Sequence, residues 1–118
     1  MENNIRYELE ANQVKIEGAF LNFDFPIKQV VEISGILIVR LDIPPKKIYN
    51  ENVFGVSISD AKIKWQIAKL NYDTGVDCPF TNVAIFEGKL RLNNWCDIYL
   101  IIDPMTGAIL ERSQPMKS

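Results

Sequence analysis

Apolar and polar residues alternate along most of this chain with a period of two, which is the spacing of a β-strand with one face in the core and one in solvent. The alternation is clearest at residues 13–17, 62–67 and 89–93. No long segment has the spacing and caps of an amphipathic helix, and the short stretch 27–33 fits a helix and a strand equally well. The pattern predicts an all-β, or nearly all-β, fold.

Residues 36–43 form the stretch richest in β-branched side chains, which predicts a central strand. Both of its faces are apolar in the first half, while Arg40 and Asp42 mark one face as solvated further along. The face expected to point into the core throughout consists of Leu37, Val39, Leu41 and Ile43.

The two tryptophans have different sequence contexts. Trp65 is in phase with Ile63 and Ile67, so the three side chains are expected to share one face and to lie in the core. Trp95 instead lies among the turn residues of segment 93–97, where a partly exposed position is expected.

Turn residues separate the apolar runs, and the last hairpin is expected to turn through Asp103–Gly107, with glycine at a positive φ angle. The alternating runs predict about eight to ten strands. We expect a single-domain antiparallel meander over residues 1–118 that forms a β-sandwich or a partly closed barrel, with a frayed tail at 113–118.

Composition narrows the class of protein. The chain has 118 residues, 47% of them hydrophobic and 24% charged, which is typical of one globular domain. No apolar run approaches the ~18 residues of a membrane helix, and the acidic start lacks a secretory signal, so a cytoplasmic location is expected. A net charge of −2 argues against a general affinity for nucleic acid.

The chain contains no histidine, which removes the commonest general base and most transition-metal sites. We expect no metal, no cofactor and no catalytic residue. A less favoured possibility is a carboxylate-dependent enzyme, which would require two of the residues Asp73, Asp77, Asp97 and Asp103 to converge in one cleft. Cys78 and Cys96 are expected to be reduced thiols, with a disulfide between them as the alternative.

Candidate binding residues lie in the C-terminal half. The turn-rich segment 71–77 forms the longest expected loop, and loops carry function more often than strands do. Aromatic side chains dominate the energetics of protein interfaces. The expected recognition surface consists of Tyr72, Asp73, Asp77, Trp95, Asp97 and Tyr99.

Several segments in the last two-thirds of the chain resemble those of known protein families. They are residues 52–54, 63–67, 79–82, 88–90, 94–95 and 103–107. The chain resembles a family of small uncharacterised bacterial β-proteins, and its strand and turn motifs are similar to those of propeller blades, although it is too short for a closed propeller. The resemblance implies an immunity-type protein that is encoded beside a toxin and binds it.

The expected function is therefore that of a non-catalytic protein-binding module, most concretely an inhibitor that binds and blocks a cognate toxin. Acidic side chains around the aromatic ones would steer a basic partner to the surface. The alternative is a small-molecule or carbohydrate-binding β-domain that uses the same aromatic side chains. An exposed strand edge would also allow a homodimer.

Overall fold

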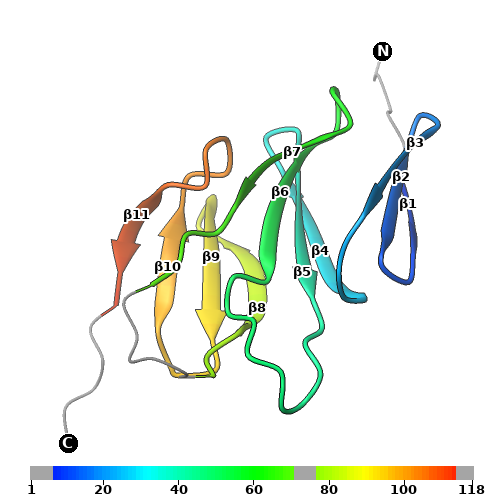
Figure 1. Ribbon diagram of the computed structural model, residues 1–118. Coiled ribbons are helices and arrows are strands. Elements are labelled where there is room, and N and C mark those ends of the chain that lie inside the picture. The colour runs from blue at the N-terminus through cyan, green and yellow to red at the C-terminus, as the bar shows by residue number, and fades with distance from the viewer. Residues whose placement is uncertain (1–6, 71–76, 114–118) are drawn as a thin grey trace, which may run out of the picture.

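The computed structural model describes residues 7–70 and 77–113, and it folds them into eleven strands, with no helix there that could span a membrane (Figure 1). The strands are β1 (Tyr7–Glu10), β2 (Gln13–Ile16), β3 (Ala19–Asn22), β4 (Ile27–Ile33), β5 (Ile36–Leu41), β6 (Val53–Ser57), β7 (Lys62–Gln66), β8 (Phe80–Phe86), β9 (Lys89–Asn94), β10 (Tyr99–Ile102) and β11 (Ile109–Arg112).

The strands form three antiparallel sheets, each a meander in which every strand pairs with the next one along the chain. The N-terminal sheet contains β1 to β3, the central sheet β4 to β7, and the C-terminal sheet β8 to β11. Figure 1 shows them in this order from right to left, with the central sheet in the middle. The prediction of an all-β antiparallel meander is confirmed.

The finer architecture agrees with the expectation in part. The described strands form three open sheets that pack face to face, as in the expected β-sandwich and unlike the alternative of a partly closed barrel. There are eleven strands in the described residues, where about eight to ten were expected. The additional strand is β1, whose four residues alternate Tyr7 and Leu9 with two glutamates and pair with β2. At the other end, Ser113 is hydrogen-bonded to Tyr99 in both directions and is not frayed, while 114–118 lie outside the described residues.

The central sheet is covered on both faces, so the chain has two apolar cores. Ile36 and Ile38 of β5 face the C-terminal sheet and pack with residues such as Leu92 and Leu100. The alternate β5 residues pack against the N-terminal sheet, and they are Leu37, Val39 and Leu41. A strand buried on both faces is apolar at consecutive positions, which explains the unbroken apolar run at the start of this strand.

An irregularity in β7 reverses the face of one predicted core residue. Trp65 pairs with Gly55, but Ile63 pairs with the adjacent Val56, so one extra residue is accommodated at Lys64. Such a bulge shifts the alternation by one position. Trp65 is 7% exposed and Ile63 is 43% exposed. The prediction that both lie on one inner face is therefore wrong for Ile63 and right for Trp65.

Trp65 connects the central sheet to the last hairpin. Its indole Nε1 donates a hydrogen bond of 2.7 Å to the carbonyl oxygen of Pro104. The ring lies between Gly55 of β6 and Gly107 of the β10–β11 turn, at both of which a Cβ atom would overlap it. Gly107 has a φ of 78° and donates to the Asp103 carbonyl, which confirms the predicted turn.

Two amide side chains attach the edge strand β8 to the central sheet. The Asn52 side chain accepts from the Phe80 backbone N–H at 2.8 Å and donates to the Phe80 carbonyl at 3.0 Å. Gln29 makes the same pair of bonds with Val83, at 3.1 and 2.9 Å. Each side chain thus forms the pair of backbone hydrogen bonds that a neighbouring strand would otherwise form with β8. These bonds fix the C-terminal sheet, which carries the candidate site, in its position on the central sheet.

Candidate functional site

The turn between β9 and β10 is held in one conformation by several bonds. We refer to its residues 94–97 as the Trp95 turn. The Oδ1 atom of Asn94 accepts from the backbone N–H groups of Cys96 and Ile98, both at 2.9 Å. The Trp95 N–H donates to the Pro79 carbonyl, also at 2.9 Å. The Trp95 turn is therefore anchored both to its own strand pair and to the segment before β8.

A disulfide between Cys78 and Cys96 makes the second connection to that segment, with a Cα–Cα distance of 5.5 Å. The expectation of two reduced thiols is therefore wrong, and the alternative of a disulfide is right. Sequence spacing could not decide between them, because the pairing depends on β8 and β9 being neighbours. Cys78 is buried and Cys96 is exposed.

We expect loss of the disulfide to lower the free energy of unfolding. The two cysteines are 18 positions apart, and closing a loop of this size contributes about 3 kcal/mol. Denaturant unfolding of a Cys78→Ser/Cys96→Ser variant should show that loss, and wild-type protein unfolded with a reductant should match it. Two thiols that react with iodoacetamide in the untreated native protein would contradict the disulfide.

Trp95 is presented to solvent on this fixed turn. Its side chain is 72% exposed, in contrast to the buried Trp65, which confirms the expected difference between the two tryptophans. A tryptophan is a large apolar side chain with a single N–H donor. Exposing it on a rigid turn leaves apolar area uncovered, and little conformational entropy would be lost when a partner covers it.

Two of the predicted carboxylates lie at the same end of the C-terminal sheet as Trp95. Asp97 lies in the same turn with a φ of 63°, and Asp77 precedes the disulfide-bonded Cys78. The Asp77 carbonyl is 3.9 Å from the Cys96 sulfur, so the two acidic residues are brought to one end of the sheet. Both are exposed. The other two loop candidates, Tyr72 and Asp73, lie outside the described residues.

Tyr99 lies on the outer face of the C-terminal sheet, away from the core. The guanidinium carbon of Arg91 is 4.3 Å from the centroid of the Tyr99 ring and 5.5 Å from that of Phe86. We call these three residues the Arg91 cradle. They line a hollow of about 160 Å³, which also includes Glu87, Lys89, Ile101 and Glu111.

Arg91 and Phe86 were not among the sequence candidates. The alternation at 89–93 placed Arg91 on a solvated face, but its neighbours there come from β8 and β10. The pairing of Ala84 with Arg91, and of Arg91 with Ile101, puts Phe86 and Tyr99 on the two diagonals beside it. Only the registers of three strands reveal the cluster.

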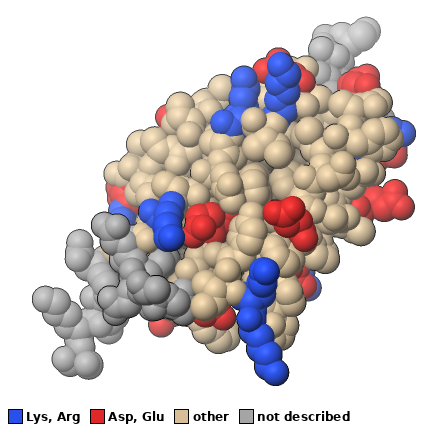
Figure 2. Space-filling view, in the orientation of Figure 1, with Lys and Arg blue, Asp and Glu red and all other residues tan. Residues whose placement is uncertain are grey.

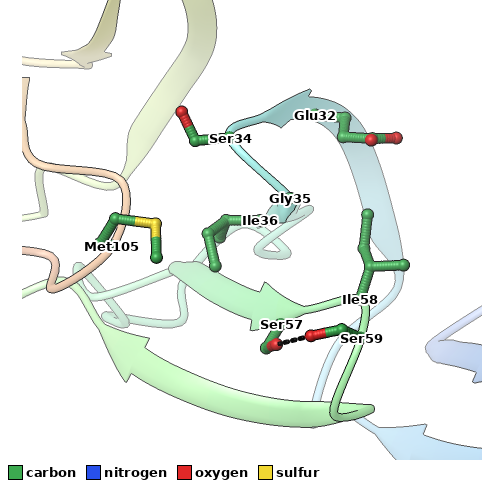
Figure 3. Close-up of a pocket in the computed structure, with 8 residues that line it drawn as sticks. All are labelled: Glu32, Ser34, Gly35, Ile36, Ser57, Ile58, Ser59 and Met105. Carbon is green, nitrogen blue, oxygen red and sulfur yellow. Dashed lines mark hydrogen bonds between the residues drawn. The ribbon is translucent and has the colours of Figure 1, made fainter.

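A different hollow, of about 240 Å³, lies where three hairpin turns meet (Figure 3). Ile36, Ile58 and Met105 form its apolar part. In Figure 3 the Ser57 and Ser59 hydroxyls face each other, and their oxygens are 3.3 Å apart. Ser57 also accepts from the Asp60 backbone N–H, so it serves the turn itself. The hollow offers hydroxyl groups to a small ligand.

On the face that Figure 2 shows, Lys and Arg are interspersed with Asp and Glu, so the charged side chains form no large patch of one sign there. Residues 7–70 and 77–113 contain no group of three potential metal-ligating side chains. The distinguishing features of the C-terminal sheet are therefore the presented Trp95 and the stacked Arg91.

Comparison with known proteins assigns the chain to a family. A family model described as a domain of unknown function, DUF7957, matches residues 4–114. The chain belongs to this family. A search of curated proteins found no match. The family relationship covers all eleven strands.

Proposed function

We propose that this member of the DUF7957 family is a non-catalytic protein-binding module and that its contact surface is centred on the Trp95 turn. The observation that carries the proposal is a tryptophan 72% exposed on a turn that a disulfide and several backbone hydrogen bonds hold in place. Tryptophan is enriched among the few residues that supply most of the binding energy at protein interfaces.

The more specific form of the proposal is an inhibitor of the immunity type, which covers the active site of a cognate toxin. Its support is a pair of exposed carboxylates, those of Asp77 and Asp97, at the same end of the C-terminal sheet as Trp95. A basic partner would be steered toward them, and this increases the association rate more than the affinity. The disulfide supports action in an oxidising environment, where such bonds persist, over the cytoplasm.

A small-molecule or carbohydrate-binding function is the second candidate. The observation that favours it is the hollow of Figure 3, where serine hydroxyls lie beside an apolar wall. At about 240 Å³ this hollow is smaller than the ~300 to 1,000 Å³ of typical ligand pockets. Protein binding through Trp95 is therefore the better-supported proposal.

Copurification with matched variants tests the proposed function. Tagged wild-type protein is expected to retain a stoichiometric protein partner from a source-organism lysate, and Trp95→Ser is expected to lose it. Phe20→Ser is the control, because Phe20 is also exposed, at 54%, but lies on the N-terminal sheet. With the purified partner, Trp95→Ser should weaken Kd about thirtyfold, equivalent to about 2 kcal/mol. Unchanged binding by Trp95→Ser would contradict the proposal.

A further inference from the structure

The Arg91 guanidinium is oriented by two aromatic rings but has no anionic partner among the described residues. It is stacked on Tyr99 at 4.3 Å and lies 5.5 Å from the Phe86 centroid. Within residues 7–70 and 77–113 the ion pairs join Lys64 to Asp60 and Lys89 to Glu111, and neither pair includes Arg91. Its Nε atom is buried without a hydrogen-bond partner.

A stacked guanidinium of this kind is suited to bind a planar anion. The rings restrict its rotation, so little entropy is lost when its remaining N–H groups form a forked pair of hydrogen bonds. Arginine forms such bidentate pairs with carboxylates and phosphates. Among the described residues no acceptor takes the Nε–H, so no hydrogen bond there neutralises the charge of the guanidinium.

The charges around the cradle favour a carboxylate over a phosphate. The hollow is lined by two cations, Lys89 and Arg91, and by two carboxylates, Glu87 and Glu111. These charges cancel, and Glu111 lies 3.9 Å from Lys89. A phosphate monoester carries about −1.5 to −2 charges, so the two glutamates would repel it more strongly than they repel a carboxylate, which carries a single charge.

The shape of the hollow indicates how that carboxylate would be carried. A volume of about 160 Å³ is well below the ~300 Å³ of the smallest typical small-molecule pockets. It accommodates one side chain or chain end that projects from a larger partner. Arg91 lies on β9 and Trp95 follows the end of that strand, four positions later, which corresponds to at most about 13 Å along an extended chain. One partner of ordinary size would therefore cover both groups.

We propose that the Arg91 cradle binds a carboxylate carried by the partner protein, an inference that rests on the proposed protein-binding function. The carboxylate lies in the plane of the guanidinium, between the Tyr99 and Phe86 rings. It belongs either to an acidic side chain or to the chain terminus of the partner, since the same forked hydrogen bonds recognise both.

Titration of the full-length ¹⁵N-labelled protein with three short peptides tests the proposal. N-acetyl-Gly-Glu-Gly-amide carries a side-chain carboxylate, N-acetyl-Gly-Gly-Gly carries a terminal one, and N-acetyl-Gly-Gln-Gly-amide carries neither. The buried Arg91 Nε–H gives the signal to follow. We expect saturable shifts with millimolar Kd from at least one carboxylate peptide, which identifies the source, and none from the glutamine peptide. Equal shifts from all three peptides, or no shift from any, would overturn the proposal.

Two variants separate recognition from general attraction between charges. Arg91→Lys keeps the charge but loses the fork, so the affinity for the peptide should fall about tenfold. Lys15→Gln removes one exposed positive charge from β2 on the N-terminal sheet and leaves the hollow unchanged, so its Kd should stay within about twofold of the wild type. If Lys15→Gln weakened binding as much as Arg91→Lys, the cradle would not be the site. Amide spectra that overlay the wild type show that each variant is folded.

The same titration distinguishes this proposal from the broader one. Trp95→Ser should leave the peptide shifts unchanged, because Trp95 is not part of the cradle. Peptide binding without any copurifying protein would contradict only the protein-binding function. A partner that binds Arg91→Lys as tightly as the wild type, while Trp95→Ser loses it, would contradict only the cradle.

Discussion

Val39→Lys is expected to yield no folded protein. Val39 is fully buried in β5, the second strand of the middle layer, and packs in the core shared with the N-terminal sheet. Its neighbours across the sheet are Val30 and Phe54, and neither can pair with an ammonium group. An unpaired buried charge costs more than the ~5 to 15 kcal/mol by which most domains are stable. Soluble expression and thermal unfolding measure the effect.

Ile63→Lys is the matched control, since it places the same side chain on the same sheet. Ile63 is 43% exposed because of the bulge at Lys64, so the variant should express and melt close to the wild type. Normal melting of Val39→Lys would contradict the assignment of the middle layer. Loss of folding in Ile63→Lys would contradict the bulge and support the simple alternation of the sequence.

Gly55→Ala is expected to lower the free energy of unfolding by about 3 kcal/mol, the upper end of the usual cost of overpacking a core. The added Cβ atom would overlap the indole ring of Trp65. The ring has little freedom to move away, because Gly107 contacts its other side and Pro104 accepts its hydrogen bond. Denaturant unfolding measures the loss.

Two further variants isolate this contact. Gly88→Ala adds a methyl group in a turn where nothing lies within 4 Å, so its cost should be only the strain of a φ of 76°, about 1 kcal/mol. In a Trp65→Leu background the Gly55→Ala change should cost much less than it does alone. An equal cost in both backgrounds would show that the indole ring does not cause the effect.

The sequence predicted the strands well because their alternation is a local property. The ranges around β5, β8 and β9 and the Asp103–Gly107 turn were all recognised from nearby residues. The three-layer arrangement could not be predicted in the same way, since both faces of β5 are apolar whether one sheet or two cover it. The prediction that Ile63 faces the core was wrong because a bulge leaves no clear signal in the residues around it.

The candidate site shows the same division between local and long-range information. The exposure of Trp95 followed from its place among turn residues, which is local. The Cys78–Cys96 disulfide and the stacking of Arg91 depend on which strands are neighbours and in what register. The two cysteines, and Arg91 with its aromatic neighbours, meet only once β8, β9 and β10 have paired. Their spacing in the sequence alone could therefore not identify these contacts.

The central claim is that a protein partner covers Trp95, and site-specific photo-crosslinking measures this most directly. A photoreactive phenylalanine analogue replaces Trp95 in one sample and the exposed Phe20 in another, and each is irradiated in a source-organism lysate. The account predicts one discrete crosslinked protein from position 95 and none from position 20. Crosslinks from position 20 alone, or the same products from both positions, would contradict it.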